Sequence, residues 1–254
     1  MSKIYTEVEA NKGFWNSIKH FFTGNNYYTS ESGVTVKTGA NEGSVFEDEK
    51  GYVYVDGMKD VSIYGTNHED AIFVTNSQVN KIDAKKGDDY IEVLDCDDVN
   101  EIYGGKGNDY IVSWNSNVDK MEGNKGNDKL VVSGGSVRYM HGAQGEDTLY
   151  TQRGANVTKI DGGRGNDTFD INRSTVGEVV GYWGADNIEA KDSNIKSIYG
   201  GTGSDTISAE RCKIGNADGG FGLFGRDNIY SLDSDFEEYH WAKFKKQSTT
   251  RRAS

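Results

Sequence analysis

The sequence predicts an all-β fold, a parallel β-solenoid (a β-roll or β-helix) of about nine coils with 19–20 residues in each. An aspartate that ends a glycine-rich turn recurs nine times, at spacings of 19, 20, 19, 19, 20, 19, 19 and 22 residues. An apolar residue stands two positions after each aspartate. Proline is absent from the 254 residues, whereas glycine occurs 33 times. The aspartates are Asp70, Asp89, Asp109, Asp128, Asp147, Asp167, Asp186, Asp205 and Asp227.

Each repeat predicts two short strands and two turns. The copy at Val99–Ser113 alternates apolar and polar residues after its aspartate, which is the period-2 pattern of a half-buried strand. Glycines before the aspartate permit the positive φ that reverses the chain. Such a coil buries its inward Ile and Val side chains only against the next coil, so many coils must stack. A β-sandwich with glycine turns is the alternative fold, but it does not require a fixed period.

Composition excludes several classes of protein. Only 35% of the residues are hydrophobic and the formal net charge is −12, so a large globular core is not expected. No run of about eighteen apolar residues occurs, which predicts no transmembrane segment. The first 28 residues show no Sec-type signal peptide. An acidic chain repels nucleic acid and suits cations, so we expect no nucleic-acid partner.

The two ends of the chain differ from the repeats and are predicted to be caps. The last coil of a solenoid exposes apolar side chains and an unpaired strand edge, and caps cover both. An amphipathic helix is expected at residues 12–22, with membrane binding as the alternative role of that helix. The predicted parts are an N-terminal cap of a short helix and irregular strands (1–59), the solenoid repeats (60–234), a short helical C-terminal cap (235–246) and a disordered tail (247–254).

The turns carry a metal-binding pattern. The sequence G-G-x-G-x-D is complete at Gly104–Asp109, Gly162–Asp167 and Gly200–Asp205. Over about residues 60–230 the chain resembles the hemolysin-like RTX family of calcium-binding repeats. The resemblance implies that turn carbonyls and the aspartate carboxylate bind Ca²⁺ between adjacent coils, and Ca²⁺ accepts such all-oxygen sites. The expected ligand residues are Asp89, Asp109, Asp128, Asp147, Asp167, Asp186, Asp205, Asp227 and Asp70, with Gly104, Gly107, Gly123, Gly126, Gly162, Gly165, Gly200 and Gly203 in the turns.

Electrostatics gives an independent reason to expect cations along this row. Neighbouring strands lie about 4.8 Å apart, so stacking places nine carboxylates in one mutually repulsive column. Nine turns leave eight gaps, and up to about eight Ca²⁺ ions there would change the net charge from −12 to about +4. Calcium binding and folding are then expected to be one process. The alternative is a metal-free solenoid whose aspartates are solvated.

Several turns depart from the full pattern, among them those that end at Asp70, Asp186 and Asp227. Gly65–Asp70 lacks the second and third glycines, and the turns that end at Asp186 and Asp227 lack the second glycine and carry Trp183 and Phe224. We expect weak or absent calcium at these three turns. Trp183 and Phe224 are then candidates for an exposed contact patch.

Each coil carries one calcium-type turn and one unrelated turn, whereas RTX proteins usually carry two nonapeptides per coil. A single-edged coil of about nineteen residues is similar to the calcium-bound solenoids of large bacterial adhesins, some of which bind ice. Ice binding requires regular threonine rows. The position three residues before the aspartate holds threonine only at Thr202, so ice binding is not expected.

These features predict a non-enzymatic, calcium-binding, extracellular or cell-surface module with a structural or adhesive role, because extracellular calcium modules are tuned to high calcium. The family resemblance implies type I secretion from a bacterial cell. The alternatives are a glycan-binding accessory module of a carbohydrate-active enzyme and a self-assembling filament or matrix subunit. Expected partners are calcium ions and a cell-surface, matrix or glycan partner. Cys96 and Cys212 occupy the same column six coils apart and are expected not to pair with each other.

Overall fold

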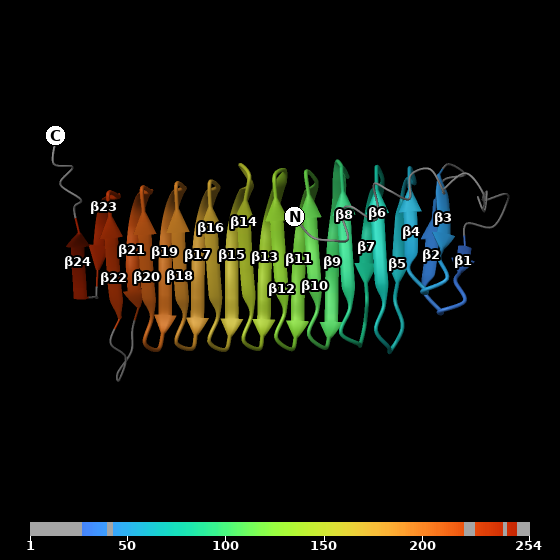
Figure 1. Ribbon diagram of the computed structural model, residues 1–254, viewed down its shortest axis with the longest axis horizontal. Helices are drawn as coiled ribbons and strands as arrows, with labels where there is room; N and C mark the ends of the chain where they lie inside the picture. The colour runs from blue at the N-terminus through green and yellow to red at the C-terminus, as the bar shows by residue number, and fades with distance from the viewer. Residues whose placement is uncertain (1–26, 40–42, 221–226, 241–242, 248–254) are drawn as a thin grey trace.

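The chain is a rod of stacked β-coils. The computed structural model describes residues 27–39, 43–220, 227–240 and 243–247, and these residues form strands and turns without helices. The strands build two sheets of twelve strands each, with the coils following one another along the long axis (Figure 1). The predicted parallel β-solenoid is confirmed.

One sheet contains the longer strands and is called the long-strand sheet. From β9 to β19 its strands have nine residues each, and neighbours in the sheet are one coil apart in the sequence. Its strands, in order across the sheet, are β1 (Tyr27–Thr29), β2 (Thr35–Thr38), β5 (Val61–Tyr64), β7 (Gln78–Asp83), β9 (Asp98–Lys106), β11 (Asn117–Lys125), β13 (Ser136–Gln144), β15 (Asn156–Arg164), β17 (Thr175–Trp183), β19 (Asn194–Thr202), β21 (Lys213–Gly220) and β23 (Asp235–His240).

The opposite sheet is called the short-strand sheet, because its strands have four or five residues each. Its strands, in order across the sheet, are β3 (Ser44–Glu47), β4 (Val53–Asp56), β6 (Ala71–Thr75), β8 (Tyr90–Leu94), β10 (Tyr110–Trp114), β12 (Lys129–Ser133), β14 (Thr148–Gln152), β16 (Thr168–Asn172), β18 (Asn187–Lys191), β20 (Thr206–Glu210), β22 (Asn228–Leu232) and β24 (Lys243–Gln247).

The register repeats from coil to coil. Ile111 pairs with Leu130 and Ile102 pairs with Met121, so equivalent positions of successive repeats lie side by side. Pairing is parallel from β4 to β24 and from β5 to β23. A constant register is the structural consequence of the 19–20-residue period, because a slip by one residue would turn every inward side chain outward.

Antiparallel strands cover the N-terminal end of both sheets. In the long-strand sheet β1 pairs with β2 and β2 pairs with β5, and in the short-strand sheet β3 pairs with β4, all antiparallel. These strands occupy hydrogen-bonding edges that parallel stacking would leave open. These strands lie within the segment predicted to be the N-terminal cap. The expected helix at residues 12–22 lies outside the described residues.

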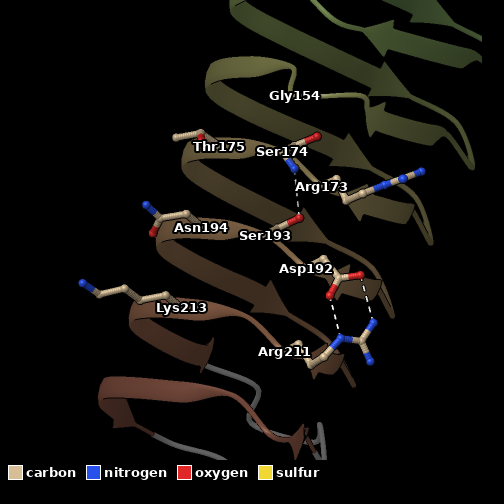
Figure 2. Close-up of a pocket in the computed structure, with 9 residues that line it drawn as sticks. All are labelled: Gly154, Arg173, Ser174, Thr175, Asp192, Ser193, Asn194, Arg211 and Lys213. Atoms are coloured by element: carbon tan, nitrogen blue, oxygen red, sulfur yellow. Dashed lines mark hydrogen bonds and ion pairs between the residues drawn. The ribbon is translucent and has the colours of Figure 1, made fainter.

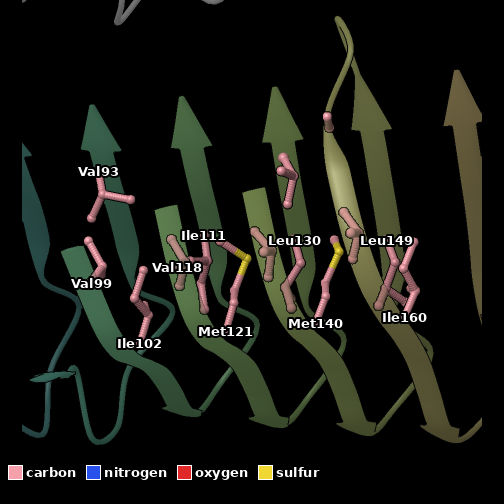
Figure 3. Close-up of a cluster of buried hydrophobic side chains, with 14 of the residues drawn as sticks. Val93, Val99, Ile102, Ile111, Val118, Met121, Leu130, Met140, Leu149 and Ile160 are labelled. Atoms are coloured by element: carbon pink, nitrogen blue, oxygen red, sulfur yellow. The ribbon is translucent and has the colours of Figure 1, made fainter. Parts of the chain in front are cut away.

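The core is a narrow apolar layer between the two sheets (Figure 3). Ile102 and Met121 of the long-strand sheet face Ile111 and Leu130 of the short-strand sheet, and all four side chains are completely buried. Burial of each such side chain stabilises the fold by about 2 kcal/mol. One continuous core runs along the rod, so the stability of each coil depends on its neighbours.

The expected helical cap at residues 235–246 is wrong. β23 pairs in parallel with β21, where Phe236 is in register with Ile214, and β24 pairs in parallel with β22, where Phe244 is in register with Ile229. Unpaired N–H and C=O groups at the sheet edges favour a further strand over the helix that the aromatic spacing suggested. Gln247, predicted as the start of the tail, ends β24, and residues 248–254 lie outside the described residues.

Candidate metal centre

The predicted aspartate row lies at the turns that lead from a long strand to a short strand. Asp109, for example, stands between the end of β9 at Lys106 and the start of β10 at Tyr110. Parallel pairing on both sides holds successive aspartates in register, and we call this side of the rod the aspartate edge. The aspartates are buried, with exposed fractions from 1% to 9%, and comprise Asp70, Asp89, Asp109, Asp128, Asp147, Asp167, Asp186, Asp205 and Asp227.

One carboxylate oxygen of every aspartate from Asp89 to Asp227 belongs to a hydrogen-bond ladder. The backbone N–H of Asp109 donates to Oδ1 of Asp128 at 2.7 Å, and that of Asp128 donates to Oδ1 of Asp147 at 2.7 Å. The same bond joins every successive pair from Asp70 to Asp227, at 2.7–2.9 Å. The carboxylates are therefore directed along the stack and into the turns.

The other carboxylate oxygen, Oδ2, has no hydrogen-bond partner in most of the row. An unpaired, buried carboxylate oxygen is costly, and Ca²⁺ is a cation that such oxygens bind directly. A row of these atoms along one edge is therefore suited to hard cations. The buried Oδ2 atoms without a partner belong to Asp89, Asp109, Asp128, Asp147, Asp167, Asp186 and Asp205.

The glycine at the first position of most turns forms a cradle for the Oδ2 atom, whereas the turn of Asp89 has Ala84 there. A Cβ atom added to Gly104 would collide with Oδ2 of Asp109, and one added to Gly123 would collide with Oδ2 of Asp128. A side chain at either of these two glycines would displace the carboxylate of its turn. The same relation holds at the predicted Gly162 and Gly200, and at Gly142 and Gly181, which the sequence reasoning did not select.

The glycine at the fourth position of most turns allows two coils to approach closely. Gly126 has a φ of +122°, and a Cβ atom there would collide with the backbone carbonyl oxygen of Gly107 in the preceding coil. Positive φ and the missing Cβ are both needed, so only glycine fits without strain. Gly107, Gly165 and Gly203 repeat this arrangement, which brings turn carbonyls of neighbouring coils to the aspartate edge.

Burial changes the acidity of the aspartate row. The pKa of Asp128 is raised to about 8, chiefly by desolvation and in part by the nearby carboxylates of Asp109 and Asp147, while the hydrogen bond from the Asp109 N–H opposes the rise. The ordinary aspartate pKa is about 3.9. A cation at this edge stabilises the anionic form and would lower these values. Desolvation raises the pKa to about 6 at Asp109 and Asp147, and to about 7 at Asp89, Asp167, Asp186 and Asp205.

The residues present fit Ca²⁺ better than a metal bound by side chains alone. Among the described residues no group of three or more His, Cys, Asp or Glu side chains is placed to hold a metal ion, since each coil adds one carboxylate to the row. Calcium accepts backbone carbonyls alongside carboxylates, whereas zinc prefers nitrogen and sulfur ligands. The unpaired Oδ2 atoms and the adjacent turn carbonyls are therefore the candidate ligands.

The two ends of the row differ from its middle. At Asp70, Oδ2 accepts a hydrogen bond from the Thr66 N–H at 2.6 Å, and Oδ1 accepts one from the Thr66 hydroxyl at 3.2 Å. This turn, which lacks two glycines, satisfies its own carboxylate. Asp227 is the most exposed aspartate of the row, at 9%, and Phe224 in the same turn lies outside the described residues.

The turn that ends at Asp186 keeps the arrangement of the complete turns, although it lacks the second glycine. Oδ2 of Asp186 is buried without a partner and lies against Gly181. Tyr182 takes the glycine position with a φ of +76°. The Trp183 ring is 51% exposed, and the Arg164 guanidinium lies 4.4 Å from its centre. The carboxylate geometry at this turn is therefore the same as in the middle of the row.

A second ladder on the aspartate edge was missed from the sequence. The side-chain oxygen of Asn108 accepts the backbone N–H of Asn127 at 2.8 Å, and that of Asn127 accepts the N–H of Glu146 at 2.9 Å. Asp88 accepts the N–H of Asn108 in the same way. The signal was present, because Asp or Asn directly precedes the aspartate in four turns, namely at Asp88, Asn108, Asn127 and Asn166.

The opposite side of the rod, where short strands lead into long strands, is called the serine edge. Figure 2 shows part of it, where the Arg211 guanidinium donates to both carboxylate oxygens of Asp192, at 2.6 and 2.9 Å. That bond lowers the pKa of Asp192. The Ser193 hydroxyl accepts the Ser174 N–H at 3.2 Å and donates to the Lys191 carbonyl at 2.7 Å. The side chains of Asp192, Ser193 and Arg211 are thus satisfied by protein groups.

Both cysteines lie in the serine column, as their equal distance from the preceding aspartate predicted. Cys96 and Cys212 are buried and not disulfide-bonded. The Cys96 N–H donates to the Ser116 hydroxyl at 3.0 Å, and the Cys212 N–H donates to the Ser234 hydroxyl at 2.9 Å. Each thiol therefore stands where other coils place a serine.

Comparison with known proteins agrees with this site. A family model described as RTX calcium-binding nonapeptide repeat matches the chain in four copies, at residues 74–111, 100–117, 141–170 and 197–211. The matched segments contain Asp89, Asp109, Asp147, Asp167 and Asp205. No curated protein and no solved structure matches the chain. Among the described residues, no helix has the length and apolar character needed to cross a membrane.

Proposed function

Because the solenoid of this chain carries RTX-type calcium-binding repeats, we propose that the protein is a structural rod whose folding depends on a ladder of Ca²⁺ ions along the aspartate edge. The observation that carries the proposal is the row of seven buried Oδ2 atoms without hydrogen-bond partners. One carboxylate from each coil and the carbonyls of adjacent turns would hold each ion, and Asp70 would contribute least because Thr66 already binds it.

The charge balance supports coupling between calcium and folding. Folding without a cation buries a column of carboxyl groups whose pKa values rise to about 6–8, so their anionic forms oppose folding at neutral pH. Up to about eight ions in the eight gaps would change the net charge from −12 to about +4. A ligand that binds only the folded state stabilises it in proportion to the logarithm of its concentration.

We place this rod outside the cell or on the cell surface, as an adhesive or matrix module. Sites built from turn carbonyls and single carboxylates suit the 10⁻⁴–10⁻³ M affinity range of extracellular calcium modules. The family analogy points to type I secretion. A structural role, and not catalysis, is proposed because calcium ligation would withdraw the aspartate row from acid–base chemistry.

The direct test is far-UV circular dichroism of the full chain in a chelator, titrated with calcium and separately with magnesium. We expect a calcium-specific transition from coil to β-structure, with several ions bound per chain by calorimetry. A β spectrum that is the same in excess chelator and in calcium would overturn the coupling of folding to calcium.

One pair of variants tests the ligand assignment. Asp128→Asn removes the charge of a buried Oδ2 in the middle of the row, and Asp98→Asn makes the same change on an exposed side chain of β9. The Asp128→Asn variant should bind one or two fewer Ca²⁺ ions, because the Asp128 carboxylate borders the gaps to the preceding and the following turn. The Asp98→Asn variant should bind as many ions as the unsubstituted chain. An unchanged count in Asp128→Asn would contradict the assignment.

A further inference from the structure

A groove lies on the outer face of the short-strand sheet, away from the aspartate edge. It has a volume of about 420 Å³, which is within the range of small-ligand sites. It crosses strands β8 to β16, and neighbouring strands there are in parallel register. The residues that line it are Tyr90, Tyr110, Val112, Trp114, Lys129, Val131, Thr148, Tyr150, Gln152, Thr168 and Asp170.

Aromatic side chains stand on both sides of an apolar floor. Val131 on β12 is 5% exposed and forms part of the floor, and its register partners are Val112 on β10 and Tyr150 on β14. Trp114 stands two residues further along β10, opposite Ser133. A sugar chain that contacts both Trp114 and Tyr150 would therefore cross the strands obliquely.

The rim of the groove is polar. Thr148, Gln152 and Thr168 lie beside the aromatic side chains, and the Tyr150 hydroxyl donates to Oε1 of Gln152 at 3.1 Å. A purely apolar ligand would cover these groups without replacing their hydrogen bonds to water. A sugar ring satisfies both surfaces, because its C–H faces contact aromatic rings and its hydroxyl groups lie at the edge.

The charged groups that border the groove are balanced. Asp170 lies at one end, Lys129 lies 4.8 Å from the Tyr110 ring centre, and the Arg153 guanidinium lies 5.4 Å from the Trp114 ring centre. The buried Glu92 accepts a hydrogen bond from the Tyr90 hydroxyl. Two carboxyl groups and two cations leave no net charge that would favour an acidic ligand. We propose that this groove binds a neutral polysaccharide chain whose sugar units contact the rings of Trp114 and Tyr150.

The groove is a binding site without hydrolytic geometry. Glu92 and Asp170 are four strand spacings apart along one register column, which is about 19 Å. Paired carboxylates of glycosidases lie about 5–10 Å apart. The bound glycan would therefore be retained and not cleaved.

Affinity electrophoresis tests the proposal, with the full calcium-loaded chain run through gels that contain hydroxyethylcellulose, a neutral β-linked glucan, or alginate, an acidic glycan. We expect retardation by the neutral polymer only, and calorimetry with cellohexaose should give the affinity. Tyr150→Ala should weaken binding about tenfold, since aromatic contacts contribute up to about 1.5 kcal/mol each. Tyr230→Ala is the matched control, because Tyr230 lies on β22 of the same sheet outside the groove and is 36% exposed.

Each outcome decides the question. Retardation by hydroxyethylcellulose that Tyr150→Ala weakens and Tyr230→Ala preserves would support the groove. Absence of retardation, retardation by alginate alone, or equal effects of both substitutions would overturn it. A calcium-loaded β spectrum recorded for each variant separates loss of the site from loss of the fold, so this result is independent of the test of calcium-coupled folding.

Discussion

The polar side chains in the turns of the two edges differ in how their hydrogen-bonding capacity is satisfied. On the serine edge, the Ser116 hydroxyl accepts the Cys96 N–H at 3.0 Å and donates to the Trp114 carbonyl at 2.8 Å, so the side chain uses protein groups alone. On the aspartate edge, Oδ1 of Asp128 accepts the Asp109 N–H, but Oδ2 has no partner. The Ser116 hydroxyl is satisfied by groups of its own coil and of the preceding coil, whereas the Asp128 carboxylate has acceptor capacity left over. Of these two edges, the aspartate edge is therefore the one whose turns are suited to a cation.

The largest effect should come from pH in the absence of calcium. The row titrates at about pH 6–8 when folded and near 3.9 when unfolded, so the folded chain binds more protons between these values. The free energy of unfolding then falls as pH rises from 4 to 8. In chelator, far-UV circular dichroism should show more β-structure at pH 5 than at pH 8, where the calcium-free chain is expected to be coil. Calcium should reverse this trend, because it binds the deprotonated carboxylates. An amount of β-structure in chelator that increases with pH would contradict the assigned burial.

Replacement of one glycine on each edge should lower the free energy of unfolding by different amounts. Gly126→Ala forces a Cβ atom against the Gly107 carbonyl at the aspartate edge, and we expect a loss of about 3 kcal/mol or more. Gly154→Ala on the serine edge also changes a positive-φ glycine, at +79°, but a Cβ there meets no atom within 4 Å. Its cost should be about 1 kcal/mol from backbone strain alone. Urea unfolding in calcium measures both, and equal losses would show that close approach of the coils is unimportant.

Ser116→Ala should produce a smaller, calcium-independent loss. The substitution leaves the buried N–H of Cys96 without its acceptor, which costs about 1–2 kcal/mol. The loss should be the same at low and high calcium, because the serine edge is remote from the aspartate row. Ser208→Ala on the outer face of β20 is the control and should change stability by less than about 0.5 kcal/mol. A loss that disappears in saturating calcium would mean that the two edges are not independent.

The smallest effect is expected for Cys96→Ser. The thiol of Cys96 lies 3.5 Å from the Leu94 carbonyl, in the position where the Ser116 hydroxyl meets the Trp114 carbonyl. A serine should adopt the same bond, so the free energy of unfolding should change by less than about 1 kcal/mol. A larger loss, measured by urea unfolding, would show that this column requires the greater volume of sulfur and not its hydrogen bond.

Much of the fold was predictable because it repeats. The apolar column that contains Ile111 and Leu130 and the spacing of the aspartates predicted the parallel register, since only that register buries equivalent side chains together. The sequence also predicted the aspartate edge and the shared column of Cys96 and Cys212. The prediction failed at residues 235–246, where the repeat ends and the spacing of Phe236 and Phe244 resembles a helix. The local sequence of residues 235–246 carries no signal that an unpaired sheet edge lies beside this segment in the fold.

Three features could be predicted from the sequence alone: the 19–20-residue repeat, the two turns of each coil and the common row of the aspartates. They follow directly from the order of the residues and from the alternation of apolar and polar side chains. Only the tertiary structure decided how each carboxylate is used. The N–H that binds Oδ1 of Asp128 comes from the neighbouring coil, and the glycine that shelters Oδ2 is brought against it by the turn. Asp70 has the same place in the repeat, but Thr66 satisfies it. The hydrogen-bond partners of a buried polar atom depend on which residues pack around it, and the spacing of one residue type in the sequence does not predict that packing.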